Sequence, residues 1–311
     1  GKSLQPKESF FLLLIFRAPR KSLQAINVVS DLQLRNASSP PDSFVLDLAE
    51  KLEETEYVSG FSLAAKETMG SLRERSAEAV LSSPWPSNKV ESYRFTDVRF
   101  LKNFNIEPIS LASADVNLDG TELNLSEKEN TRIVYVDGAI ISDPSSLSVF
   151  QEGKGMFFGS ISSLSDDIIR ENVLPKLGTS AEWINADFFA SLNGIGAPEL
   201  GVIIVPEGVK VEDPMHVLYY SSQGGKKGDD IDDGKDGYFV SSPRLLVLVG
   251  KGAELHIVEE FIGGAGELYW ANAVVEFFIE DEAQVFHSYV QNQGRHAVHI
   301  KQTCVAQVCF L

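Results

Sequence analysis

Histidine and cysteine side chains are the groups of this sequence best suited to bind a metal ion or to carry sulfur. The chain has 311 residues but only five histidines and two cysteines, and no C-x-x-C or H-E-x-x-H pattern joins them, so a closed zinc site is not predicted. Two thiolates also fall short of the usual ligand set of an iron–sulfur cluster. We therefore assign no catalytic, cofactor-binding or metal-ligating residue. The histidines and cysteines are His216, His256, His287, His296, His299, Cys304 and Cys309.

The last predicted strand carries a histidine and a cysteine close together. Strand alternation places His299, Lys301 and Thr303 on one face and Ile300 and Cys304 on the other. We expect Cys304 to face inward and to pack as a small, inert hydrophobic side chain. The alternative is a group that handles sulfur or metal inside a solenoid, and the sequence leaves open whether Cys304 or His299 does so.

Glycine-rich segments do not form a recognisable nucleotide or calcium site. The 24 glycines include no G-x-x-x-x-G-K-[ST] pattern, so the chain has no P-loop. The short G-K-G segments at 153–155 and 250–252 are better explained as corners between strands. Residues 224–237 are rich in glycine and aspartate, but neither register of a calcium loop puts an oxygen ligand at each required position. We interpret them as a solvated loop.

The charge is divided unevenly along the chain. Residues 1–40 hold six basic and two acidic side chains (+4), whereas residues 41–311 hold 21 basic and 42 acidic ones (−21), which gives the net charge of −17. An acidic surface repels phosphate groups, so neither nucleic acid nor a membrane is expected as a partner. The basic, serine-containing leader resembles a transit peptide, although a disordered tail or a secretory signal at the apolar residues 10–16 are alternatives.

Helical patterns dominate the first half of the chain. Apolar spacing predicts helices within residues 42–83, divided at Gly60 and ended by the proline-rich residues 84–86. Residues 91–101 could form a strand or a short helix. Asp137-Gly138 between two apolar runs predicts a β-hairpin over residues 132–141, and helical spacing returns at 162–177 and 181–193.

From residue 201 onward the pattern is β. Apolar runs occur at 202–205, 216–222, 245–249, 254–261, 268–279, 284–290 and 296–308, with no helix long enough for a crossover between them. A weak repeat relates the strand that begins at Ala253 to the one that begins at Ala283, 30 residues later. This period is typical of a β-solenoid, but the periodicity alone is equally compatible with a β-sandwich. The predicted organisation is a leader at 1–41, a helical or mixed region at 42–195 and a β core at 196–311.

Six segments in this order resemble the SufB/SufD family of iron–sulfur cluster assembly proteins, over residues 42 to 308. They are residues 91–96 (ESYRFT), 132–138 (RIVYVDG), 188–193 (FFASLN), 201–209 (GVIIVPEGV), 242–250 (SPRLLVLVG) and 253–260 (AELHIVEE). The segment at 132–138 is similar to the SufD branch. Together with the leader, it favours a plastid SufD type in the chloroplast stroma.

The resemblance implies a fold and a role. The fold would be mainly β with α, with a helical N-terminal region followed by an incomplete right-handed parallel β-helix. The chain would be a non-catalytic scaffold subunit that joins SufB-like and SufC-like subunits, or a homodimer, in cluster assembly and transfer. ATPase activity would belong to the SufC-like partner. No cofactor is expected on this chain alone, and an iron–sulfur cluster is expected only within the complex.

The sequence departs from the family pattern at its C-terminal end, within an early or middle rung of the implied β-helix. The family's SufC-binding segment and a functionally important histidine would follow residue 311, so we expect a truncated form and transfer that role to none of the five histidines. Two other functions remain open. One is a β-helix enzyme that acts on polysaccharide, for which Glu259, Glu260 and Glu280 offer acids; the other is an interaction module without chemistry.

Overall fold

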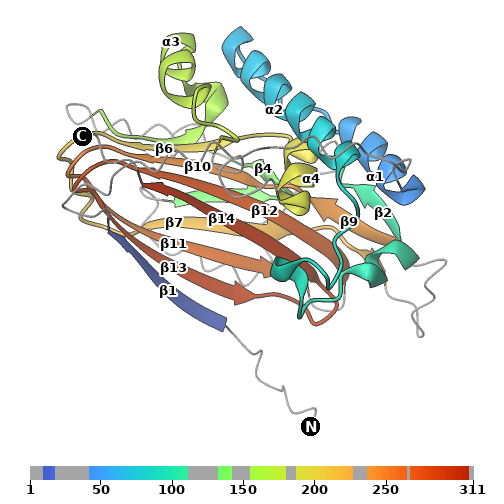
Figure 1. Cartoon of the computed structure of the whole chain (residues 1–311). Helices are drawn as coiled ribbons and strands as arrows, with labels where there is room; N and C mark the ends of the chain where they lie inside the picture. The colour runs from blue at the N-terminus through green and yellow to red at the C-terminus, as the bar shows by residue number, and fades with distance from the viewer. Residues whose placement is uncertain are drawn as a thin grey trace.

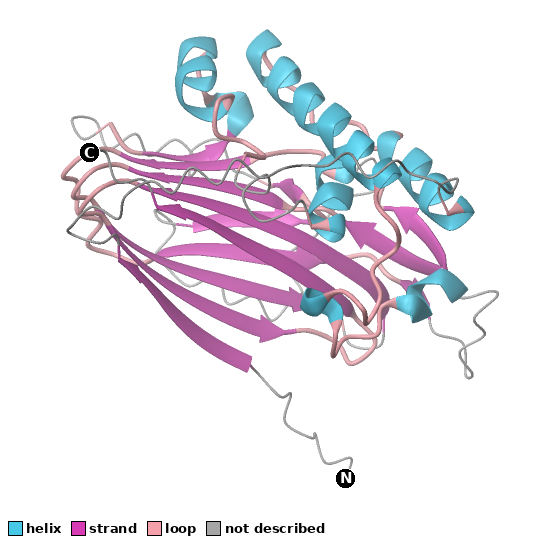
Figure 2. Ribbon diagram, in the orientation of Figure 1, coloured by secondary structure: helices cyan, strands magenta, loops and turns pink. Residues whose placement is uncertain are grey.

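Two β-sheets form the body of the structure, and helices cover the outer face of one of them (Figures 1 and 2). The computed structural model describes residues 10–17, 42–110, 132–141, 155–179, 187–226, 237–264 and 267–307. The predicted composition, mainly β with some helix, is confirmed, and both sheets are mixed. Most of the leader, the centre of the glycine- and aspartate-rich loop and Cys309 lie outside the described residues.

The helices begin at side-chain caps that the sequence supplies. Asp42 accepts a hydrogen bond from the Phe44 amide at the start of α1 (Ser43–Glu53), and Ser62 caps α2 (Leu63–Ser82) in the same way. Asp187 caps α4 (Phe188–Gly196). The helices predicted within residues 42–83 are thus confirmed. The remaining helical turns are η1 (Glu91–Tyr93), η2 (Arg99–Asn103), η6 (Ile161–Ser163), α3 (Asp166–Ile168) and the π-helical η7 (Ile169–Val173).

The chain passes back and forth between the two sheets. The first sheet, sheet A, has the order β1-β13-β11-β7-β3-β4; the second, sheet B, has the order β2-β9-β12-β10-β6-β5, with β14 and β8 also paired to β12. Sheet A consists of β1 (Phe10–Arg17), β3 (Arg132–Val136), β4 (Ala139–Ile140), β7 (Met215–Ser221), β11 (Glu254–Gly263) and β13 (Gln284–Asn292). Sheet B consists of β2 (Asn105–Pro108), β5 (Phe157–Ser160), β6 (Gly201–Val205), β8 (Gly225–Lys226), β9 (Gly237–Ser241), β10 (Arg244–Val249), β12 (Glu267–Ile279) and β14 (Val298–Gln307).

The 30-residue repeat predicted from the sequence appears as strand register. Leu245 of β10 is opposite Val275 of β12, and Leu255 of β11 is opposite Val285 of β13, in parallel pairs. Each repeat therefore adds one parallel strand to each sheet. The antiparallel pairs are β1 with β13, β3 with β4, β5 with β6 and β8 with β12, and they make the sheets mixed.

The predicted Asp-Gly hairpin is also confirmed. Asp137 and Gly138 have φ values of 53° and 95° between β3 and β4. Two consecutive positive φ values are typical of the tight turn that suits the strand twist of a hairpin. The turn places the Asp137 carboxylate against Ser222, where it accepts hydrogen bonds from the amide and the hydroxyl of that residue.

Sheet B is buried on both faces. One set of side chains, including Val247, Val275 and Phe277, packs between the sheets, and the alternate set, including Leu246 and Phe278, packs under α2 and the turns near it. This arrangement explains why β10 is a continuous apolar run rather than an alternating one. The side chains of β14, which pairs with β12, therefore alternate between the space between the sheets and the helical layer.

Candidate functional site

Three charged or titratable side chains meet between the sheets. They are Glu259 on β11, His287 on β13 and Lys301 on β14, and we call them the inter-sheet charge cluster. The Glu259 Oε1 atom lies 2.6 Å from His287 Nε2 and 3.0 Å from Lys301 Nζ. The exposed fractions of the three side chains are 0%, 1% and 9%. The cluster therefore joins two strands of sheet A to a strand of sheet B and is closed off from solvent.

Strand alternation places Glu259 in the core. Along β11, Leu255, Ile257 and Phe261 face the inter-sheet core, and Glu259 occupies the position between the last two. A carboxylate at such a position costs free energy unless it is paired, and here two neighbouring strands supply the partners. An acidic residue inside an apolar row was the sequence signal for this site, whereas Glu259 was predicted only as one of the acids of a possible polysaccharide enzyme.

The surroundings fix Glu259 in its ionised form. Burial acts to raise the pKa of its carboxyl group, but the charge of Lys301 and the hydrogen bond to His287 outweigh burial and lower the pKa to about 2. Lys301 makes two further contacts: its Nζ donates to the Thr303 hydroxyl at 2.7 Å and lies 5.1 Å from the centre of the Tyr289 ring. The lysine is thus held by a carboxylate, a hydroxyl and an aromatic face.

A second polar pair lies beside the cluster. The hydroxyl of Tyr289 is 2.5 Å from Nε2 of His299, and the edge of the His299 ring contacts Phe261. Burial lowers the pKa of His299 to about 4, and the charge of Lys301 acts in the same direction. His299 is therefore neutral near pH 7. Burial also raises the pKa of the Tyr289 hydroxyl, so both partners of this hydrogen bond are neutral.

The position predicted for Cys304 needs a correction. Cys304 is buried, as expected, with 1% of its surface exposed. It is opposite Glu276 of β12, which faces the helices, whereas His299 and Lys301 lie on the alternate face between the sheets. The prediction that Cys304 is buried is confirmed, but the burial comes from the helical layer on the outer face of sheet B rather than from the space between the sheets.

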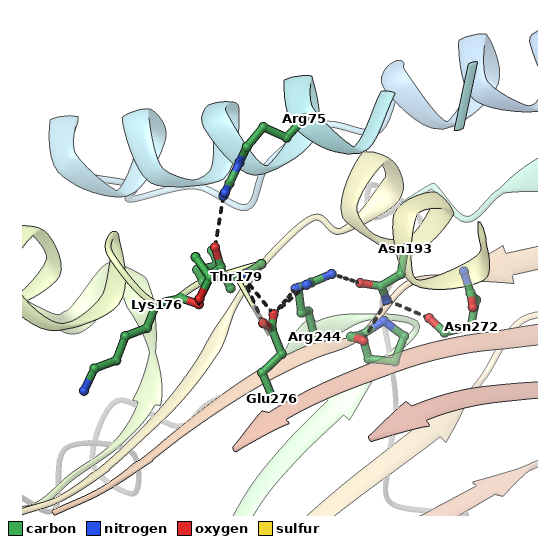
Figure 3. A network of polar contacts seen from close by, with 10 residues as sticks. Arg75, Lys176, Thr179, Asn193, Arg244, Asn272 and Glu276 are labelled. Carbon is green, nitrogen blue, oxygen red and sulfur yellow. Dashed lines mark hydrogen bonds and ion pairs between the residues drawn. The ribbon is translucent and has the colours of Figure 1, made fainter. Parts of the chain in front are cut away.

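The outer face of sheet B carries a second buried network, under α4 (Figure 3). Arg244 donates from Nη2 to Glu276 Oε1 at 2.5 Å and from Nη1 to Asn193 Oδ1 at 2.9 Å. The Asn193 amide donates to the carbonyl oxygen of Asn272 at 2.7 Å, and the Gly178 amide donates to Glu276 Oε2 at 3.0 Å. These contacts fasten α4 and the turn after η7 to the sheet.

The structure does not gather the histidines into one centre. His216 lies 2.9 Å from Glu260, and His256 stacks on Phe286. Within the described ranges, no group of three His, Cys, Asp or Glu side chains could hold a metal ion. In the same part of the chain, no helix is long and apolar enough to cross a membrane. The inter-sheet charge cluster can hold charge and align strands, but it offers no open path to a substrate.

The β-rich part of the chain matches a known protein domain. Residues 231–308, which contain β9 to β14, match the SufBD core domain of SUF-system FeS cluster assembly. The chain is 38% identical over 282 residues to Protein ABCI7, chloroplastic, of Arabidopsis thaliana, a match over 89% of this chain and 55% of that protein. It is 24% identical over 245 residues to the iron-sulfur cluster assembly SufBD family protein slr0076 of Synechocystis sp., over 76% of this chain and 50% of that protein.

The chain thus spans about half the length of these two relatives. The similarity to a chloroplastic protein supports the predicted plastid location. The matched core domain begins just before β9 and ends just after β14, so it contains all three residues of the inter-sheet charge cluster. Residues 231–308 thus match a SufBD core domain, and the chain as a whole is similar to a chloroplastic protein and to a cyanobacterial SufBD family protein.

Proposed function

We propose that this chain is a non-catalytic scaffold subunit of a SufB–SufC–SufD-type complex that supports assembly and transfer of iron–sulfur clusters. The observation that carries the proposal is the 38% identity to a chloroplastic relative over 89% of the chain, together with the SufBD core domain. ATP hydrolysis belongs in this proposal to a SufC-like partner, in keeping with a sequence that has no P-loop.

A scaffold role is in keeping with the buried chemistry of the core. The inter-sheet charge cluster is shielded from solvent, and Cys304 is buried under the helices. Groups so placed stabilise the fold rather than contact a substrate. We expect any iron–sulfur cluster to form only in the assembled complex and not on the isolated chain.

The finer fold is part of the same proposal. Parallel strands that return to each sheet after 30 residues suggest the first rungs of a right-handed parallel β-helix. In sheet A the edge beyond β13 is occupied by the antiparallel β1, whereas β14 continues sheet B as a parallel strand beside β12. A subunit built this way is suited to pair with a second subunit of the same architecture.

Co-purification tests the proposal. An affinity-tagged form of the chain would be co-expressed with SufB-like and SufC-like subunits from a plastid system, with an unrelated acidic protein carrying the same tag as the control. We expect a complex that contains the SufB-like subunit, and visible absorption of a cluster after anaerobic addition of iron and sulfide only in that complex. Recovery of neither subunit would contradict the proposal.

A further inference from the structure

A short segment after α2 concentrates exposed apolar side chains. Phe95 is 92% exposed, Val90 46% and Phe100 41%. Among the described residues, three of the six large hydrophobic side chains that are exposed fall in this stretch of eleven residues. These side chains and those of Arg94 and Arg99 lie within eleven consecutive residues, and we call them the aromatic–basic surface. Clustered exposed apolar groups of this kind mark binding sites more often than isolated ones do.

The segment is firmly held on its inner side. The Tyr93 hydroxyl donates to the Asp187 carboxylate, and its ring packs against Phe189 of α4. Val98 and Leu101 are buried in the core under α1. Phe95 is therefore presented outward by a backbone that is anchored before and after it. An anchored aromatic side chain loses little conformational freedom on binding, which is why such side chains often dominate interfaces.

A recess lies next to the exposed ring. It has a volume of about 240 Å³ and is lined by residues 86–88 on one side and 94–99 on the other. The Arg94 guanidinium carbon is 5.5 Å from the centre of the Phe95 ring. Each arginine is paired with a carboxylate of the same segment, Arg94 with Glu91 at 3.9 Å and Arg99 with Asp97 at 2.7 Å. The aromatic–basic surface thus combines a protruding ring, a shallow recess and two arginines.

The local charge is opposite to that of the rest of the chain. Residues 84–104 hold four basic and two acidic side chains, a balance of +2. The other 290 residues hold 23 basic and 42 acidic ones, a balance of −19. An acidic partner is repelled by most of the chain but attracted here, and charges beyond about 10 Å are screened by salt. A partner complementary to this surface would carry carboxylates around an apolar site for Phe95.

We propose that the aromatic–basic surface docks an acidic protein that receives the assembled cluster. This inference rests on the proposed scaffold function for the identity of the partner as an acceptor, and on the charge and exposed side chains for its chemistry. Phe95 is the anchor, and Arg94 and Arg99 set the orientation of the acceptor.

The experiment measures binding of an acidic plant-type apo-ferredoxin, labelled for fluorescence anisotropy, to the full chain and to its complex with the SufB-like subunit. Phe95→Ala should weaken binding at least ~10-fold, as loss of a central aromatic anchor does. The double variant Arg94→Glu/Arg99→Glu should weaken it further and remove its salt dependence. There are two matched controls. Leu63→Ala truncates a side chain on α2 that is 63% exposed, and Lys210→Glu reverses the charge of a side chain that is 70% exposed and lies outside the aromatic–basic surface. Both should leave the affinity within ~2-fold of the unmodified chain.

The outcomes separate this inference from the proposed function. Equal affinity of the Phe95→Ala variant, or no binding by the unmodified chain at roughly 100 μM, overturns the docking inference. The urea midpoint of each variant is checked first, so that a binding loss caused by unfolding is recognised. Co-purification of the SufB-like subunit should be unaffected by Phe95→Ala. Failure of the unmodified chain to co-purify that subunit would instead reject the scaffold function.

Discussion

Removing one charge of the inter-sheet charge cluster should destabilise the fold strongly. The Glu259 carboxylate and the Lys301 ammonium are 3.0 Å apart, with 0% and 9% of their side chains exposed. Removing one member of such a buried pair leaves the other charge without compensation and typically costs about 3–5 kcal/mol. We therefore expect Glu259→Gln to lower the free energy of unfolding by about 3 kcal/mol, since His287 and Thr303 remain as polar neighbours.

A double-mutant cycle with Lys301→Met isolates the interaction. Methionine keeps most of the length of the lysine side chain and removes its charge, so the double variant has no unpaired charge at this position. The structure predicts a coupling free energy of about 1.5 kcal/mol or more between the two substitutions, measured by urea unfolding with equal m-values. Additive effects, within about 0.5 kcal/mol, would show that the two side chains do not interact and would refute the cluster.

The loss of stability at low pH provides a second measurement on Glu259. The pKa of Glu259 is about 2 in the folded protein against 4.5 for the unperturbed group. A lowered pKa stabilises the fold above pH 4.5, and this contribution, about 3 kcal/mol, is lost as the pH falls from 4.5 toward 2. Glu259→Gln should flatten the unfolding free energy over that window. If the unfolding free energy of the variant depended on pH as strongly as that of the unmodified chain, the lowered pKa of Glu259 would be contradicted.

Three further predictions concern stability. Burial raises the pKa of Glu199 from 4.5 to about 7, so the folded state retains a proton and the free energy of unfolding should fall as the pH rises across that interval. Thermal unfolding at pH 5 and pH 8 should show no such loss for Glu199→Gln, which should be more stable than the unmodified chain at pH 8. Gly194→Ala should lower the free energy of unfolding in urea by about 2 kcal/mol or more, because its Cβ would lie 2.1 Å from the Ser76 hydroxyl oxygen. The control is Gly70→Ala, whose new Cβ has nothing within 4 Å and which should be neutral or stabilise α2 by up to about 1 kcal/mol. Asn193→Ala should cost about 2–4 kcal/mol in the same assay, since it leaves a buried guanidinium and two carbonyl oxygens without this partner; a cost below about 0.5 kcal/mol would contradict the network under α4.

Local patterns in the sequence predicted much of the fold. Helix spacing and a proline stop located α1 and α2, Asp137-Gly138 located the hairpin, and the similarity of the strands at Ala253 and Ala283 predicted the 30-residue register. Each of these features depends on neighbouring residues or on a repeat. They are the kinds of information that a single sequence carries most directly.

The candidate site was not predicted, because it depends on contacts between distant strands. Alternation separates the two faces of β14 but does not say which face meets the other sheet. Since sheet B is buried on both faces, an apolar or small residue such as Cys304 fits either one. The pairing of Glu259 with His287 and Lys301 required the register of three strands, and only the acidic residue within the apolar row of β11 indicated it.

We propose that this chain is a scaffold subunit that pairs with a SufB-like partner. Native mass spectrometry of the two purified proteins, mixed at equal concentration, tests it most directly. We predict a species with the summed mass of one copy of each, formed by the unmodified chain and by Phe95→Ala alike. Spectra that contain only the separate proteins, from a chain that unfolds cooperatively in urea, would contradict the claim.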